Sequence, residues 1–323
     1  MVSRLLLYKI LQLFIFMVLG FLLVKLKVVK SQDSRVLSKL SLYLFMPAVI
    51  LNAFNMEMTD EVVSGLTLAF VVAVLIHILL LGLDFVFQKA FRCAKVERAS
   101  IMYSNAGNLI IPIVLFILGE EWIVYSCAYL IVQLIFLWTH GVRLFSKDAT
   151  LGIKKIFLNV NMITIIISFI LMFSGLRLPA FASDISSDLG SMLAPAGMLV
   201  AGMLAADLNI VSVLKNKRLY FVIFARLILC PAVVLLLIKS ILMFVHIENA
   251  DEILLISYLA SITPSASTVM QFAQIYHEDA DYAVAINIAT TVVCVLTMPL
   301  FVLFFLKMAF ERTKNNQQKG AAL

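Results

Sequence analysis

The chain has 323 residues, of which 63% are apolar and only 14% are charged, and its mean hydropathy is +1.06. A soluble domain of this size would carry charge on about a quarter of its residues. Uncharged runs of about 20 residues, long enough to cross a hydrocarbon layer of ~30 Å, follow one another along most of the sequence. The composition therefore excludes an ordinary soluble domain and indicates a polytopic α-helical membrane protein.

The net charge of +6 is better explained by loop placement than by affinity for nucleic acid, because the basic residues gather between particular apolar runs. The four cysteines are widely spaced and form no CxxC pair. They are interpreted as small apolar fillers, not as disulfides or metal ligands. No cofactor and no metal site are predicted.

Taken in chain order, the apolar runs predict ten transmembrane helices. They cover residues 5–24, 36–54, 64–87, 98–118, 122–145, 156–175, 187–206, 219–243, 253–275 and 282–306. The first run lacks the small-residue cleavage site of a signal peptide, so we take it as the first span. The connections are short, which predicts one integral unit that ends in a polar tail at residues 308–323.

Basic residues predict the orientation, because short cytoplasmic loops retain Lys and Arg. The loops after spans 1, 3, 5 and 7 are basic, whereas those after spans 2, 4, 6 and 8 are wholly or mainly acidic. This pattern predicts a multi-pass protein of the cell inner (plasma) membrane with its amino terminus outside. Two features oppose it, namely the acidic loop HEDAD after span 9 and a carboxyl tail with Lys307, Arg312, Lys314 and Lys319.

Proline positions inside the spans indicate an internal repeat. Pro47 and Pro112 lie 65 residues apart in spans 2 and 4, and Pro195 and Pro264 lie 69 residues apart in spans 7 and 9. Because five spans is an odd number, the second half enters the membrane from the opposite side, as in the inverted repeats of secondary transporters. The expected division is a first repeat at residues 1–145, a cytoplasmic connecting loop at 146–155 and a second repeat at 156–307.

Polar segments with a proline lie in the middle of spans 4 and 9. They are SNAGNLIIP (Ser104 to Pro112) and TPSAS (Thr263 to Ser267). Backbone freed at mid-bilayer must be satisfied by protein, water or ligand. Half-helices that restart after Pro112 and Pro264 would both point their positive amino ends at the midplane, which predicts a site for a carboxylate.

Several motifs of the chain match one family's pattern. NAGNLIIP is similar to its N-x-G-N-x-G-x-P signature, with Ile110 in place of a glycine, and LNVNMITIIISFI is similar to its N-P-N helix opening, with Val160 in place of the proline. RLILCP, TPSASTVMQFAQIYHEDADYA and ATTVVCVLTMP also match. The chain resembles a bacterial, malate-permease-like member of the auxin efflux carrier family, which is related in fold to the bile acid:sodium symporters.

The resemblance implies ten helices in a scaffold and a transport bundle, with helices 4 and 9 crossing at their broken middles. It also implies export or import of small organic anions such as malate or auxin-like acids, by an elevator-type motion.

The candidate substrate ligands gather at the two polar segments. Asn105 and Asn108 either donate amides to a carboxylate or cap the exposed backbone, and Gly107 permits close helix approach. Three hydroxyl residues after Pro264 are natural caps for a restarting helix. Asn159 is the expected N-cap of span 6, and only the resemblance makes Asn161 a candidate. The predicted substrate-binding residues are Asn105, Gly107, Asn108, Pro112, Asn161, Pro264, Ser265, Ser267 and Thr268.

A second group of polar residues is assigned to coupling or to structure. His77 and Asp84 share one face of span 3 and form either a proton relay or ordinary packing. Arg226 lies about two helical turns inside span 8, too deep to stay unpaired, and is expected to form a salt bridge to Asp84 or Asp207. The others either line a path or make interhelical hydrogen bonds. This group consists of His77, Asp84, Gln133, Asp207, Arg226, Gln271 and Asn287.

The predicted function is a secondary carrier for a small organic anion that works by alternating access, with an anion channel or a transporter-derived sensor as the alternative. An enzyme is not predicted, because the chain has no HExxH, GxSxG, GxGD or nucleotide-binding glycine motif. Proton or sodium coupling stays open. The expected partners are a small organic anion and the lipid bilayer, and a homodimer is one option for assembly.

Overall fold

A computed structural model describes residues 2–57, 59–146, 154, 157–206, 216–245 and 247–320. Within these residues the regular structure is helical, apart from one isolated antiparallel bridge between Ser104 and Ser265. Six helical stretches are long and apolar enough to cross a membrane, and they are Ser31–Ala53, Asp60–Ala90, Glu120–Phe145, Ala180–Ala206, Lys217–Leu242 and Ala280–Phe310. The predicted all-α fold is confirmed.

The helices of the first half lie where apolar runs were found. They are α1 (Val2–Lys25), α2 (Ser34–Leu40), α3 (Met46–Ala53), α4 (Asp60–Ala90), α5 (Lys95–Met102), α6 (Ala106–Ile117), α7 (Ile123–Phe136) and α8 (Val142–Phe145). Four shorter turns complete them, the 3-10 turns η1 (Ser31–Asp33) and η3 (Glu120–Trp122) and the π turns η2 (Ser41–Phe45) and η4 (Leu137–Gly141).

The second half begins with α10 (Val160–Ser174), α11 (Ala180–Ser191) and α12 (Leu193–Ala206). It continues with α14 (Lys217–Phe224), the π turn η5 (Ala225–Leu229), α15 (Cys230–Leu242), α16 (Ala250–Ile262), α17 (Ser267–Ile275) and α18 (Ala280–Gly320). The last helix continues through most of the residues expected to form a polar tail. Asp207 and most of the expected connecting loop lie outside the described residues.

One local expectation is wrong. The helix of span 4 does not restart after Pro112, because α6 begins at Ala106 and holds Pro112 in its interior. At the starts of two other helices, a side chain caps the helix. The Thr59 hydroxyl accepts from the Val62 N–H at 3.3 Å at the start of α4, and the Asn159 side chain caps α10 as predicted.

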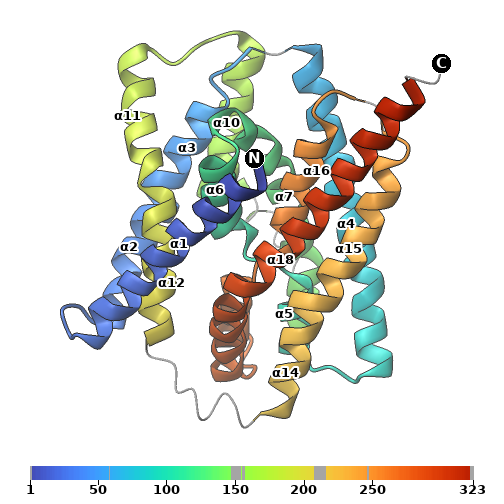
Figure 1. The fold of residues 1–323 in the computed structure, drawn as a ribbon. Coiled ribbons are helices and arrows are strands. Elements are labelled where there is room, and N and C mark those ends of the chain that lie inside the picture. Colours follow the sequence, from blue (N-terminus) through green and yellow to red (C-terminus); the bar gives the residue numbers. More distant parts are fainter. Residues whose placement is uncertain are drawn as a thin grey trace.

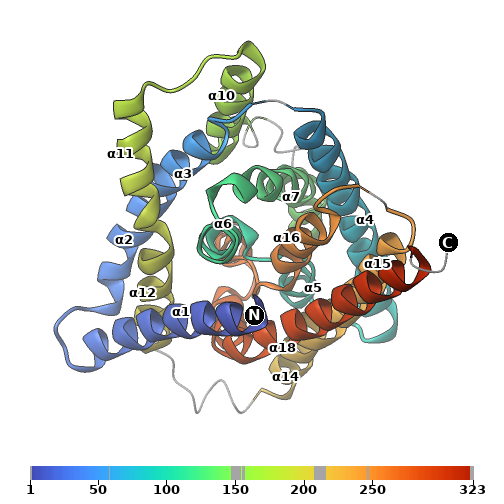
Figure 2. The ribbon, with the colours of Figure 1, turned by 45° about the horizontal axis from the view of Figure 1, so that its top comes forward.

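Contacts between helices divide the described chain into two groups. α1, α2, α3, α10, α11 and α12 pack mainly with one another, and so do the helices from α4 to α8 and from α14 to α18. Figure 1 and Figure 2 show the first group beside the second, with α12 and α1 facing α6 and α18. This division separates the helices of predicted spans 1, 2, 6 and 7 from those of the other predicted spans.

Glycines let α1 and α12 approach at the backbone. A Cβ atom on Gly202 would lie 1.8 Å from the Met17 carbonyl oxygen, and one on Gly20 would lie 2.2 Å from the Leu199 carbonyl oxygen. Such distances are impossible for any larger residue. Small residues at a membrane helix interface allow this close packing, so α1 and α12 form a tightly joined pair.

The described residues that follow predicted spans 3, 7 and 9 share one face of the molecule. Lys95 Nζ lies 2.8 Å from Glu278 Oε1, which joins the loop after span 3 to the acidic loop after span 9. Arg218, after span 7, lies 3.0 Å from Glu97 Oε2. The acidic loop that opposed the charge pattern is thus paired with a basic residue of the same face.

The even-numbered loops lie at the opposite face, together with α18's final turns. Figure 1 shows the α10–α11 connection and the carboxyl end at the top and the α4–α5 turn at the bottom. Arg312 of the tail pairs with Asp251 at 2.7 Å, and Arg177 pairs with Glu57 at 2.8 Å. Arg312, one of the basic residues that opposed the predicted orientation, therefore pairs with an acidic residue at this face.

Candidate functional site

The helical interruptions of spans 4 and 9 are hydrogen-bonded to each other. α5 ends and α6 begins on either side of residues 103–105, and α16 and α17 flank residues 263–266. The Asn105 N–H donates to the Pro264 carbonyl at 2.7 Å, and the Ala266 N–H donates to the Tyr103 carbonyl at 2.9 Å. Two segments from different halves of the chain therefore lie side by side and antiparallel, deep in the protein.

Each interruption is also held by an amide side chain from the last span of its own half. Gln133 of α7 donates to the Ser104 carbonyl at 2.8 Å and accepts from the Ser104 hydroxyl. Asn287 of α18 donates to the Ser265 carbonyl at 2.6 Å. Of the two interpretations left open for Gln133 and Asn287, the structure shows interhelical hydrogen bonds. They supply the partners that lipid cannot offer to non-helical backbone.

Arg226 is wholly buried and binds carbonyls at the ends of two helices. Its guanidinium donates to the carbonyl oxygens of Thr263 and Ile101, both at 3.0 Å, and to that of Ser261 at 2.7 Å. The last carbonyls of α5 and α16 have no intrahelical donors, and their helix ends carry partial negative charge. One planar cation therefore serves both helix ends.

The expected salt bridge between Arg226 and Asp84 is wrong. Asp84 instead pairs with Arg98, whose Nε donates to Asp84 Oδ1 at 2.8 Å. Asp207, the other expected partner, lies outside the described residues. The physical reason is that helix-terminal carbonyls at the interruption are closer acceptors than any carboxylate on the described part of the chain.

The amino ends of α6 and α17 carry no side-chain cap. Their N-cap residues are Asn105 and Ala266, and neither side chain accepts from the helix backbone. By contrast, side chains do cap α4, α10 and α14. Amino-terminal N–H groups without a cap, at the positive end of a helix dipole, are suited to bind an anion.

The N-cap residue of α17 is not one of the three expected hydroxyl residues. The helix begins at Ser267, and the preceding Ala266 has no hydroxyl. Ser265 is 1% exposed, and its hydroxyl has no hydrogen-bond partner among the described residues. Ser267 and Thr268 lie half-buried in the first turn of α17. The Ser265 hydroxyl is therefore near the helix start without capping it.

The other candidates are spread more widely. Gly107 and Asn108 belong to the first turn of α6, and their side chains lie outside the described part of the structure. Pro112 removes the N–H that would pair with the Asn108 carbonyl in a regular helix. Asn161 is buried on α10, which packs against α3. Gln271 is exposed on α17.

His77 and Asp84 do not form a relay in this structure. His77 Nδ1 hydrogen-bonds to the Ala73 carbonyl at 2.7 Å, and its ring stacks on Phe136 with centroids 5.2 Å apart. Asp84 faces Arg98 and His140. His77 therefore has the packing role that was the alternative interpretation.

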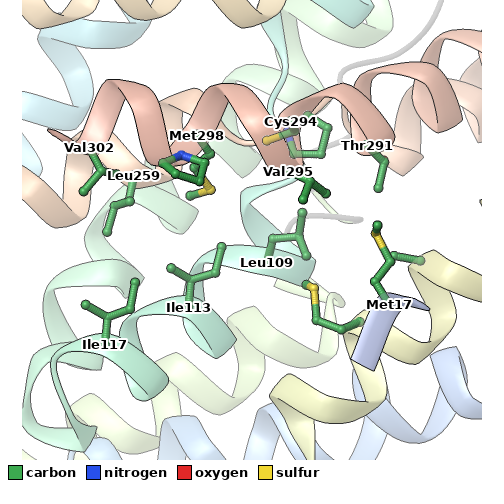
Figure 3. Close-up of a pocket in the computed structure, with 14 residues that line it drawn as sticks. Met17, Leu109, Ile113, Ile117, Leu259, Thr291, Cys294, Val295, Met298 and Val302 are labelled. Carbon is green, nitrogen blue, oxygen red and sulfur yellow. The ribbon is translucent and has the colours of Figure 1, made fainter. Parts of the chain in front are cut away.

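An apolar cavity of about 80 Å³ borders Pro264, between the two helix groups. Figure 3 shows Leu109, Ile113 and Ile117 of α6 opposite side chains of α18, with Met17 of α1 at one end. The α18 residues are Thr291, Cys294, Val295, Met298, Pro299 and Val302. Sequence reasoning missed this lining. Its helical periodicity is visible in the sequence, but the same periodicity marks lipid-facing helix surfaces.

Comparison with known protein families matches residues 5–152 and 149–302 to the family described as membrane transport protein. No curated protein matches the chain significantly. The family match spans nearly the whole sequence in two segments, and it agrees with the motifs around Asn105 and Pro264. The chain therefore belongs to the membrane transport protein family, which includes the auxin efflux carriers, and it is a multi-pass membrane protein.

Proposed function

We propose that the protein is a secondary transporter that moves a small organic anion by alternating access, with the anion bound where the two interruptions meet. The observation that carries this proposal is the pair of hydrogen bonds that joins residues 103–105 to 264–266, because it places two uncapped helix amino ends near one another. Such ends favour a carboxylate.

Buried positive charge supports the same conclusion. All the hydrogen bonds given above for Arg226 go to backbone carbonyls, so within the described residues no carboxylate neutralises it there. A charge in a low-dielectric interior acts over longer distances than one in water. Arg226 therefore makes the meeting point attractive to an anion even though carbonyls occupy its donors.

The two helix groups supply the moving parts of the proposal. Ten spans form two inverted repeats, in which the broken spans 4 and 9 cross at mid-bilayer. The group that contains α1 and α12 is the scaffold, and the group that contains α6 and α18 carries the site. The face with basic loops is cytoplasmic, by the rule that relates Lys and Arg to topology, and the amino terminus lies outside.

The cavity lining narrows the substrate class. Of the described residues around the cavity, only Thr291 and Cys294 have polar side-chain atoms. Burying a second carboxylate against such a wall without a partner would cost several kcal/mol. The lining therefore favours a monocarboxylate with an apolar body, such as an auxin-like acid, over a dicarboxylate such as malate.

Counterflow in proteoliposomes tests the proposal. Vesicles loaded with unlabelled phenylacetate or malate are diluted into the labelled acid, and uptake above equilibrium is measured. We expect saturable counterflow with phenylacetate and weak counterflow with malate. Flux without counterflow would indicate a channel instead, and no response to either acid would contradict an anion carrier.

The site assignment has its own variant and control. Asn105→Ala should reduce the apparent affinity by about tenfold if its amide contributes one hydrogen bond to a charged group. Thr67→Ala is the matched control, because Thr67 is exposed on α4 and its hydroxyl only bonds back to Val63. Equal uptake by wild type and Asn105→Ala would show that Asn105 does not bind the substrate.

A further inference from the structure

A chain of side chains connects a buried carboxylate to the interruption of span 4. His140 Nε2 lies 3.6 Å from Asp84 Oδ2, and His140 Nδ1 lies 2.8 Å from the Tyr103 hydroxyl. Tyr103 directly follows α5, and its carbonyl accepts the hydrogen bond from Ala266. Asp84, His140 and Tyr103 thus form a path from α4 through the π turn η4 to the meeting point.

The environment of His140 combines charge with restricted access to water. The side chains of Asp84 and Arg98 are 5% and 12% exposed, and that of His140 is 28% exposed. The groups that face His140 are Asp84 from α4, and Arg98 and Tyr103 from α5 and its end. Asp84 and Arg98 together carry no net charge, so a proton on His140 would give these three side chains a net charge of about +1 beside the Asp84 carboxylate.

Tyr103 has one hydroxyl proton and two acceptors for it. Its oxygen lies 3.0 Å from the Phe136 carbonyl as well as 2.8 Å from His140 Nδ1. When His140 is neutral with its proton on Nε2 toward Asp84, Tyr103 can donate to Nδ1. When both ring nitrogens carry protons, Nδ1 becomes a donor, and the tyrosine proton must turn to Phe136.

We propose that His140 and Asp84 form a proton-binding site whose occupancy is transmitted by Tyr103 to the paired interruptions. The inference rests on the proposed transport function and adds the proton as its coupling ion. A hydronium ion gives a proton to Nδ1 and becomes water, the charge is stabilised by the Asp84 carboxylate, and the Tyr103 O–H turns from Nδ1 to the Phe136 carbonyl. No covalent bond other than N–H forms.

The packing around Tyr103 explains how a turn of its hydroxyl proton can affect the interrupted segments. A Cβ on Gly141 would lie 3.2 Å from the Tyr103 ring, so the ring fits closely against η4 at a glycine. Tyr103 itself is fully buried. Because its ring is confined and its backbone is bonded to Ala266, a change at the hydroxyl acts on both interrupted segments.

Labelling of Cys294 provides a readout that does not depend on any substrate. Cys294 lines the cavity beside Pro264 and is 5% exposed. Purified full-length protein in nanodiscs is treated with N-ethylmaleimide between about pH 5.5 and 8, the range in which histidine titrates. Modification of Cys294 is followed by peptide mass spectrometry. The rate in wild type is divided by the rate in His140→Gln at the same pH, which cancels ionisation of the thiol itself.

We expect the ratio of labelling rates to change by about fivefold or more between about pH 5.5 and 8. Its dependence on pH should fit the titration of a single group, with one midpoint. In Asp84→Asn the midpoint should move to lower pH, because the anion that stabilises the protonated imidazole is gone. His277→Asn is the control, since His277 is exposed on the face of the odd-numbered loops and its positive φ of 56° is tolerated by asparagine. Its profile should match that of wild type.

A ratio that stays flat with pH would overturn the proposal, as would an unchanged midpoint in Asp84→Asn. Melting temperatures of all variants show whether a changed labelling rate comes from unfolding. Tyr103→Phe is a second test of the proposal, because it keeps the aromatic ring but removes the hydroxyl proton that turns between His140 and Phe136. That variant should also flatten the profile. None of these measurements requires anion transport, so the proton site and the proposed function can fail separately.

Discussion

Replacement of Arg226 by methionine would test what holds the interruptions together. The change removes the donors of three buried carbonyls, those of Ile101, Ser261 and Thr263. Each buried acceptor left without a partner costs about 1–3 kcal/mol. Removing the cation returns part of its own desolvation penalty, so we expect a net loss of about 3–5 kcal/mol in the free energy of unfolding.

Arg226→Lys separates the charge from the hydrogen-bonding geometry. Lysine keeps the positive charge, but a single ammonium cannot reproduce a planar fork that reaches the ends of both α5 and α16. We expect a loss of about 1–3 kcal/mol, roughly that of one or two unsatisfied carbonyls.

Denaturant titration in mixed micelles measures the free energy of unfolding of Arg226→Met and Arg226→Lys. Hydrogen exchange of the backbone amides of Asn105 and Ala266 shows whether the interrupted segments open before the rest of the protein. Exchange should accelerate in Arg226→Met before the rest of the protein unfolds. Stability within about 1 kcal/mol of wild type, with unchanged exchange at these amides, would refute the reasoning.

Other substitutions test the packing and the amide clamps. Gly202→Ala should lower the melting temperature strongly, because its Cβ would lie 1.8 Å from the Met17 carbonyl, whereas Gly82→Ala should leave it unchanged, because nothing lies within 4 Å of that position. Gln133→Leu should cost about 1–3 kcal/mol in an unfolding titration by leaving the Ser104 carbonyl unsatisfied. Asn287→Leu should cost a similar free energy of unfolding, because it leaves the Ser265 carbonyl without its donor. If neither variant lowers the free energy of unfolding, Gln133 and Asn287 do not stabilise the interrupted segments.

The sequence was informative wherever polar residues are rare. In a chain this apolar, a proline with several polar neighbours stands out, so the interruptions near Ser104 and Pro264 could be predicted. The error at Pro112 has a clear cause. The start of α6 is set by the hydrogen bonds of residues 103–105 to the other segment, and proline is tolerated in the helix that follows.

The partners of Arg226 could not be predicted, because side-chain patterns do not show which backbone carbonyls lack donors. His140 was missed for a related reason. It lies in a π turn, where the helical periodicity shifts, so its spacing from Asp84 and Tyr103 gives no sign of their contact. The cavity lining was hidden by the uniform hydrophobicity of the chain.

In the anion carrier that we propose, the charge balance at the meeting point gives Arg226 a role in anion selectivity as well as in structure. Two helix amino ends and two carboxyl ends lie near the interruptions, and each carries about half an elementary charge of its own sign. Their net charges cancel to first order, so the amino ends contribute N–H donors for a carboxylate rather than net charge. The Arg226 cation then leaves a net charge of about +1, and it lies against the carboxyl ends. Arg226→Lys should therefore retain the preference for anions while losing stability, whereas Arg226→Met should lose both, a separation that a purely structural arginine would not produce.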